Sequence, residues 1–204
     1  NVTMLTGKIP KNLKVDDIYR QKISIESMGK GKVKTIRLWS TDLDHEGFLN
    51  RIIAYTTFIL QCFFKILFSR NVDVLMALHP FPPFFVSILL LCKLKKIKFI
   101  VNITDLWPDN FIELGVIKNK FIYSIVKKLC TFVYKNSDTA IISNDELKTG
   151  VSKYFSNQDK MFILPQATNV DIFKPIQVSK KKFPNKFVVM YAGIFSPNYD
   201  FDII

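Results

Sequence analysis

The stretch at residues 97–109 (IKFIVNITDLWPD) most constrains the fold of this 204-residue chain. Its first half is an apolar run rich in β-branched residues and bounded by lysines, which is typical of a strand buried on both faces. Polar and aromatic residues follow within a few positions. Open α/β sheets bind ligands at the carboxyl ends of their parallel strands. The stretch therefore predicts a central strand that leads directly into a binding site.

Similar apolar runs alternate with helical patterns along the chain. Strands are predicted at residues 2–5, 22–28, 32–38, 72–78, 97–103, 138–142, 160–164 and 187–192. Helices are predicted at 48–68, 84–94 and 120–135, and from a cap at Ser143 or Asn144 to about Tyr154. This order predicts right-handed crossovers and a parallel Rossmann-like sheet with flanking helices, so the fold class is α/β. Glycines between the second and third strands predict a hairpin.

In a parallel sheet, the residues that follow the strands gather at one edge. The residues predicted there are Thr6, Gly7, His79, Thr104, Asp105, Ser143, Pro165 and Gln166. Asp105 either accepts a proton from a ligand or forms a local turn or helix cap. His79 at a strand end is more often a structural hydrogen-bonding group than a catalyst. Trp107 is either a packed anchor or a stacking surface for a sugar or lipid.

The segment at residues 48–68 is the most hydrophobic helix candidate, and its 21 residues would span roughly 30 Å. Three interpretations stay open: a core helix, a core helix with one face touching lipid, and a membrane span. Gln61 and Lys65 argue against a span, because a charge at the bilayer centre costs about 2.5–3.5 kcal/mol.

The chain has a net charge of +12, and all but four of its 29 basic residues are lysines. Such a charge favours anionic partners such as phosphates or an anionic membrane surface. The few arginines and the lack of a recognisable nucleic-acid-binding module argue against nucleic acid as a partner.

Three widely spaced cysteines, Cys62, Cys92 and Cys130, lie inside apolar helical patterns and are expected to be buried thiols. This fits a cytoplasmic protein. The sequence contains no cluster of metal-ligating residues, no dinucleotide fingerprint and no phosphate-binding loop, so neither a metal site nor a cofactor is predicted.

The order of these elements resembles family 4-type glycosyltransferases of the GT-B fold, of the kind that make O-antigen, capsule and other cell-surface glycans. The resemblance rests on DVLMALHPFPP, KFIVNITDLWPDNFIELGVI, YKNSDTAIISNDELK, KMFILPQATNVDIFKP and FVVMYAGIFSPNYDFDII. It covers nearly the whole chain, and the Asp-Leu-Trp-Pro element with the Val-Asp-Ile-Phe-Lys-Pro segment is its most specific part.

The resemblance implies the N-terminal half of a two-domain fold. Residues 1–175 would form the acceptor-binding domain without its first strand, 176–186 a linker, and 187–204 the start of a nucleotide-sugar-binding domain. The site residues that it implies are Asp105 as the catalytic candidate on the acceptor side, Gly7, His79, Thr104 and Trp107 for acceptor binding, and Gly193 and Ser196 for donor binding. Ser196 stands where the family usually has a second glycine, and Thr104 where arginine or histidine is common.

The implied activity is the transfer of a hexose from a nucleotide-sugar to a lipid-linked or glycan acceptor in cell-surface polysaccharide synthesis. The implied location is the inner face of the cell membrane, with the protein bound peripherally to anionic lipid. Because the donor domain is incomplete in this sequence, these residues alone are expected to be inactive. The alternative is a Rossmann-like ligand-binding or regulatory module without catalysis.

Overall fold

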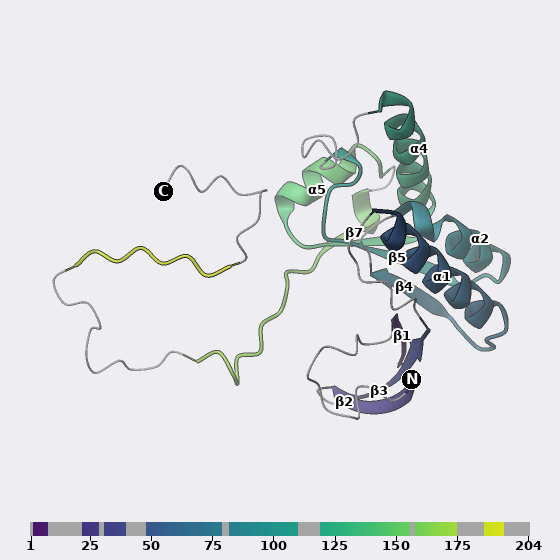
Figure 1. Cartoon of the computed structure of the whole chain (residues 1–204), viewed down its shortest axis with the longest axis horizontal. Helices are drawn as coiled ribbons and strands as arrows, with labels where there is room; N and C mark the ends of the chain where they lie inside the picture. Colours follow the sequence, from purple (N-terminus) through teal and green to yellow (C-terminus); the bar gives the residue numbers. More distant parts are fainter. Residues whose placement is uncertain are drawn as a thin grey trace.

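The computed structural model describes residues 2–7, 22–28, 31–39, 48–78, 82–109, 119–155, 158–174 and 186–193. Within these residues the chain is an α/β protein with a four-stranded parallel sheet, helices packed on it and a separate three-stranded sheet (Figure 1). The predicted fold class, a Rossmann-like parallel sheet with flanking helices, is confirmed at this level.

The four-stranded sheet has the order β4 (Val74–Leu78), β5 (Lys98–Ile103), β6 (Thr139–Ile142) and β7 (Met161–Ile163). All neighbouring strands are parallel, and the strands follow each other in chain order. The register aligns Ala77, Val101, Ala140 and Met161 in one row across the sheet, and all four are buried. This row is the base of the hydrophobic core.

The helices of the sheet pack against this buried face. They are α2 (Val86–Leu94), α4 (Lys120–Asn136) and α5 (Asp145–Ser152). Two short 3-10 turns accompany them: η2 (Pro82–Phe85) precedes α2, and η3 (Gln158–Lys160) follows α5. Their inward side chains join the strand residues in one cluster, within which Leu89, Cys130 and Val151 are fully buried. The side chains of Asn119 and Asn144 cap α4 and α5, and the second cap agrees with the sequence prediction.

The opposite face of the sheet is much more open. Met76, Leu78 and Phe162 are exposed there, and Ile100 is half-buried. The prediction that residues 97–103 are buried on both faces is therefore only partly right. An apolar strand sequence shows what the strand can bury, whereas burial itself requires a second layer to cover it.

The second sheet has the order β1 (Val2–Gly7), β3 (Gly31–Leu38) and β2 (Ile23–Met28). The predicted hairpin is confirmed, since β2 and β3 pair antiparallel with Ile23 opposite Ile36. β1 pairs parallel to β3 and does not join the four-stranded sheet, contrary to the prediction that Gly7 ends at the same edge as Asp105. Apolar patterning identifies a strand but does not specify its neighbour in the sheet.

Helix α1 (Phe48–Leu67) connects the second sheet to the core. Its buried side carries Ala54, Cys62 and Ile66, and its Gln61 amide exchanges two hydrogen bonds with the backbone of Trp39, just after β3. Among the helices of the described segments, none combines the length and hydrophobicity of a membrane span.

The three cysteines are free and buried, as predicted. Burial raises the pKa of the Cys62 and Cys130 thiols to about 12 and that of Cys92 to about 11, from an ordinary value of 9.0. They act as core side chains, because a thiol that stays protonated is a poor nucleophile.

The strand predicted at residues 187–192 is not observed. Residues 186–193 have no sheet partner among the described residues, and Phe187 and Met190 are almost fully exposed. Residues 164–174 form an exposed, irregular segment ahead of it, and residues 175–185, which include most of the predicted linker, lie outside the described part of the chain.

A lysine that follows α2 caps the C-terminal end of α1. Lys95, just after α2, donates from Nζ to the carbonyl oxygens of Ile66, Leu67 and Ser69 at 2.7, 2.8 and 2.6 Å. The last carbonyls of a helix lack partners within it and carry partial negative charge. Lys95 therefore satisfies this helix end and fixes α1 against α2.

We expect Lys95→Met to lower the free energy of unfolding by about 2 kcal/mol, because charged hydrogen bonds to partly buried carbonyls are lost. Urea denaturation followed by circular dichroism measures this change. Lys93→Met, on the exposed side of the same helix, is the matched control and should change it by less than about 0.5 kcal/mol. Equal effects of the two variants would contradict the role assigned to Lys95.

Candidate functional site

The carboxyl ends of the four parallel strands lie at one edge of the sheet. The ladder aligns Ile103, Ile142 and Ile163 at the ends of β5, β6 and β7. Thr104 and Asp105, Ser143 and Asn144, and Leu164 and Pro165 therefore follow at the same edge, as the sequence predicted for this part of the sheet. At this edge the side chain of Asn144 is occupied in capping α5, through the backbone N–H of Leu147 at 2.8 Å.

Asp105 presents an exposed carboxylate at this edge. The hydroxyl of Thr104 donates to its Oδ2 at 3.1 Å. The backbone N–H of Trp107 bonds to the main-chain carbonyl of Asp105 at 3.0 Å rather than to its carboxylate. The local turn therefore leaves the carboxylate accessible, although the sequence alone could equally have placed it in a turn or cap.

A small cavity of about 10 Å³ lies beside Asp105. It is lined by Phe85, Val101, Asn102, Ile103, Thr104, Asp105, Trp107 and Tyr134. This volume is close to the minimum that holds one water molecule. The cavity is therefore too small for a sugar ring in this conformation, and a ligand at this edge would rest above it.

Tyr134 on α4 also lines this cavity. Tyr134 is fully buried, and its hydroxyl has no hydrogen-bond partner of good geometry among the described residues. Burial raises the pKa of Tyr134, with smaller contributions from Cys130 and Tyr154, and the backbone N–H of Trp107 acts in the opposite direction. The site thus combines an exposed carboxylate with a neutral buried hydroxyl.

A second carboxylate, Asp109, has a different environment that the sequence did not reveal. The hydroxyl of Tyr123 on α4 donates to Asp109 Oδ1 at 3.0 Å. The hydroxyl of Tyr154, just after α5, lies 3.0 and 2.8 Å from Oδ1 and Oδ2. Asp109 therefore ties the segment after β5 to both helices.

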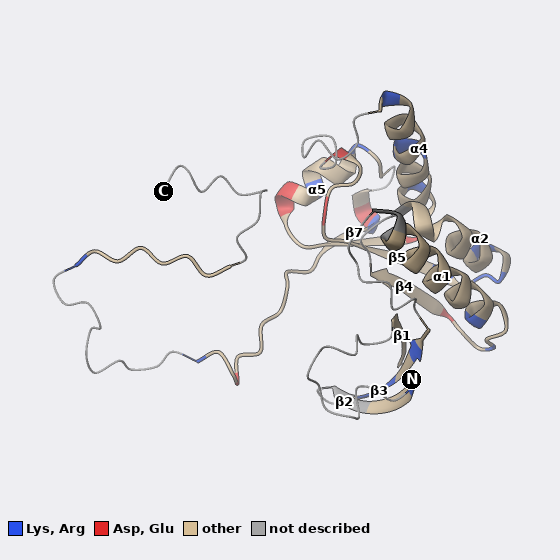
Figure 2. Ribbon diagram, in the orientation of Figure 1, with Lys and Arg blue, Asp and Glu red and all other residues tan. Residues whose placement is uncertain are grey.

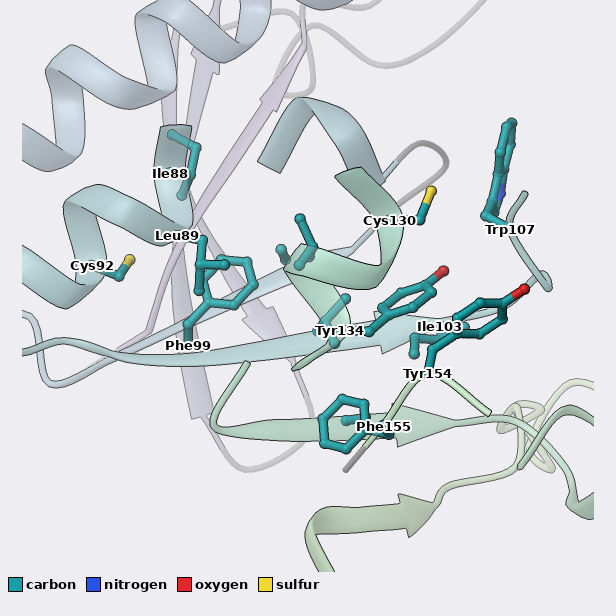
Figure 3. Close-up of a cluster of buried hydrophobic side chains, with 14 of the residues drawn as sticks. Ile88, Leu89, Cys92, Phe99, Ile103, Trp107, Cys130, Tyr134, Tyr154 and Phe155 are labelled. Atoms are coloured by element: carbon teal, nitrogen blue, oxygen red, sulfur yellow. The ribbon is translucent and has the colours of Figure 1, made fainter. Parts of the chain in front are cut away.

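Aromatic and cationic groups complete this cluster. The rings of Tyr134 and Tyr154 lie 6.0 Å apart between centroids, side by side in Figure 3. Lys127 places Nζ 5.6 Å from the Tyr123 ring centroid and 5.9 Å from that of Tyr154. The four-residue spacing of Tyr123 and Lys127 on a helix was the one available sequence signal. Nothing in the sequence connected Asp109 with Tyr154.

The other predicted site residues are not gathered at Asp105. Trp107 is 9% exposed and belongs to the core cluster, which is where the packing interpretation places it. Gly7 ends β1 in the other sheet, and a Cβ there would meet open space. Gly193 lies in the exposed segment 186–193, and His79 and Ser196 lie outside the described residues. Within the described segments, no group of three His, Cys, Asp or Glu side chains could hold a metal ion.

Comparison with known proteins gives no match. No protein-family model fits this chain, and no curated protein is significantly similar to it.

The two carboxylates should respond differently to the loss of charge. We expect Asp109→Asn to lower the free energy of unfolding by about 1–3 kcal/mol, because it weakens the hydrogen bonds from two partly buried tyrosine hydroxyls. Asp105→Asn, at an exposed position, should change it by less than about 0.5 kcal/mol. Urea denaturation of both variants measures the difference, and a larger effect at Asp105 would contradict this assignment.

Stability should fall at alkaline pH. Burial first, and then the hydrogen bond and charge of Asp109, raise the pKa of Tyr123 and Tyr154 above the ordinary 10.0, while burial raises the thiol pKa values above 9.0. Between the unfolded and folded pKa values, the unfolded chain has released protons that the folded protein still holds. The free energy of unfolding should therefore change little between pH 7 and about pH 9 and fall above that, by up to about 1.4 kcal/mol per pH unit for each group.

Urea denaturation between pH 7 and pH 11 measures this slope. Tyr154→Phe should make the slope above pH 10 less steep, because one titrating group is removed. A slope unaffected by this substitution would show that Tyr154 titrates with an ordinary pKa.

Proposed function

We propose that this chain is the acceptor-binding part of a GT-B glycosyltransferase, which moves a sugar from a nucleotide-sugar donor to a lipid-linked or glycan acceptor in cell-surface polysaccharide synthesis. Two things support this proposal: the sequence resemblance described above, and the α/β fold with its parallel sheet. The observation on which the proposal mainly rests is the exposed Asp105 carboxylate at the carboxyl edge of that sheet.

The position of Asp105 suits a role toward a hydroxyl acceptor. In glycosyl transfer, the acceptor oxygen forms a bond to the anomeric carbon as the bond between that carbon and the diphosphate breaks. The acceptor hydroxyl must lose its proton, and the leaving diphosphate gains negative charge. Asp105 can accept a hydrogen bond from the acceptor hydroxyl and receive or steer its proton. The Thr104 hydroxyl, 3.1 Å from the carboxylate, holds it in place.

The buried parts of the site support positioning of the acceptor. Tyr134, with its buried hydroxyl, and Trp107 both line the small cavity. The Asp109 cluster fixes the segment after β5, which carries Asp105 and Trp107, at the sheet edge. In this proposal Trp107 contributes as a packed wall beside the acceptor.

The donor would bind between this domain and a second one. The exposed apolar segment 186–193 would begin that second domain, with Gly193 and Ser196 near the donor diphosphate. The exposed side chains of Phe187, Val189 and Met190 suit a strand that becomes buried only within a larger sheet. The charge of the diphosphate is compatible with the net charge of +12.

Calorimetry with the 204-residue chain tests the proposal. We expect a short-chain polyprenyl-diphosphate-sugar to bind, and Asp105→Ala to weaken this binding about tenfold, which corresponds to the loss of one charge-assisted hydrogen bond. Glu146→Ala, at an exposed position on α5, is the control and should leave the affinity unchanged. Nucleotide-sugars alone should bind weakly.

Two results would contradict the proposal. If the acceptor analogue does not bind to the folded chain, the site is not an acceptor site. If a nucleotide-sugar binds tightly and Asp105→Ala abolishes that binding, the edge of this sheet holds the donor, and the assignment of the domains is wrong. Tight binding of an unrelated small ligand, with no binding of the acceptor analogue, would favour the alternative of a non-catalytic Rossmann-like module.

A further inference from the structure

Tyr134 places a hydroxyl group in the protein interior without an acceptor for its proton. The residue is fully buried, and its oxygen has no hydrogen-bond partner of good geometry within the described segments. Burial raises the pKa of Tyr134, and the backbone N–H of Trp107 opposes this effect. That N–H group is a donor and can approach only the lone pairs of the hydroxyl oxygen. The proton of the hydroxyl therefore still needs an acceptor, because a buried O–H group left unpaired costs free energy.

The carboxylates near α4 narrow the choice of that acceptor. The charged side chains of α4 are all lysines, and in Figure 2 the helix shows blue segments and no red. Asp109 already receives hydrogen bonds from Tyr123 and Tyr154. Asp105 acts on Tyr134 electrostatically: burial raises the pKa of Tyr134 most, and the charge of Asp105 adds a smaller effect in the same direction. Asp105 is therefore the carboxylate with which the hydroxyl can be linked.

Tyr134 and Asp105 share a cavity rather than a direct hydrogen bond. Both line the cavity of about 10 Å³ described above, together with Thr104 and Trp107. In Figure 3 the ring of Tyr134 points from α4 toward the side on which Trp107 lies. A buried water molecule needs about one probe sphere of space and two to four polar partners. The volume of the cavity and the polar groups of its lining residues meet both requirements for a single water.

We propose that one water molecule occupies this cavity and links the two groups: the Tyr134 hydroxyl donates to the water, and the water donates to Oδ1 of Asp105. The other carboxylate oxygen, Oδ2, already accepts a hydrogen bond from the Thr104 hydroxyl at 3.1 Å. Each oxygen is then held by a different group, which fixes the orientation of the carboxylate. Tyr134 is thus a positioning residue that acts through Asp105, and its role in acceptor binding rests on the function proposed above.

A water-mediated link leaves Asp105 free to bind a ligand. A carboxylate has about four lone-pair positions that accept hydrogen bonds. Thr104 and the water would use two of them, and the exposed remainder can receive an acceptor hydroxyl. Asp109, by contrast, bonds directly to two tyrosine hydroxyls and joins elements of the fold. The same pair of residue types therefore serves structure at Asp109 and positioning at Asp105.

A double-mutant cycle followed by urea denaturation tests the link, with circular dichroism establishing that each variant is folded. We expect Tyr134→Phe to lower the urea midpoint, because the water loses its hydrogen-bond donor. The same substitution should have a clearly smaller effect in the Asp105→Ala background, because the link is already broken there. The control is Tyr154→Phe, which should lower the midpoint equally in both backgrounds, because Tyr154 bonds to Asp109.

Two outcomes of the cycle would overturn the proposal. A midpoint that Tyr134→Phe leaves unchanged or raises would show that the hydroxyl has no hydrogen bond to lose. Equal effects of Tyr134→Phe in the two backgrounds would show that its partner is not Asp105.

A high-resolution crystal structure locates the water directly. We expect one ordered water within hydrogen-bond distance of both Tyr134 Oη and Asp105 Oδ1. A dry cavity, or a Tyr134 hydroxyl bonded to a main-chain carbonyl, would contradict the link.

Calorimetry with the polyprenyl-diphosphate-sugar separates the positioning role from the proposed function. Tyr134→Phe should weaken binding severalfold in the otherwise unmodified chain and leave it unchanged in the Asp105→Ala background, because Tyr134 acts through Asp105. Equal weakening in both backgrounds would show a merely structural effect and overturn the positioning role. If the unmodified chain does not bind this compound, the proposed function fails, whereas the cycle still confirms or overturns the link between Tyr134 and Asp105.

Discussion

Hydrophobic contact between one face of the four-stranded sheet and the helices beside it holds the rest of this structure in place. Phe99, Val101 and Ile142 are completely or almost completely buried against Leu89 and Val133. Each such side chain contributes about 1.5–3 kcal/mol by leaving water. The exposed ion pair between Lys98 and Asp138, 3.0 Å long, contributes about 0–1 kcal/mol by comparison. Packing on this face therefore determines where the strand ends lie, and with them the candidate site.

Two carboxylates four residues apart illustrate how that packing divides roles. Asp109 receives hydrogen bonds from two tyrosines that α4 and the end of α5 supply, so its oxygens are occupied in joining elements. Asp105 is exposed, and within the described part of the chain the one side chain that donates to it is the hydroxyl of its neighbour Thr104. A group whose bonding capacity is satisfied internally serves structure, whereas a group left open to solvent can bind a ligand. This difference is the reason for choosing Asp105, and not Asp109, as the carboxylate of the proposed acceptor site.

The fold was predictable from the sequence to a considerable extent. Apolar periodicity gave nearly all the helices and strands of the four-stranded sheet, because the period of the buried side chains differs between a helix and a strand. The pairing of β1 was not predictable in the same way, since any strand with a free edge can accept it. Residues 187–192 have the composition of a strand but make no strand-to-strand hydrogen bonds within the described residues. A strand forms only when it pairs with a neighbouring strand. The sequence predicted that Thr104 and Asp105 lie at the carboxyl edge of the sheet, and it did not reveal the contacts of Asp109, Tyr134 and Tyr154.

The sequence by itself determined the α/β class, the place of the polar residues after β5, the buried state of the three thiols and the cationic character of the chain. These properties depend on local patterns and on composition. Only the tertiary structure decided that one face of the sheet is covered and the other left open, that β1 belongs to a second sheet, and that Asp109 meets Tyr154 across 45 residues of chain. Such contacts form between residues far apart in the sequence, and no local pattern specifies which distant side chains will meet.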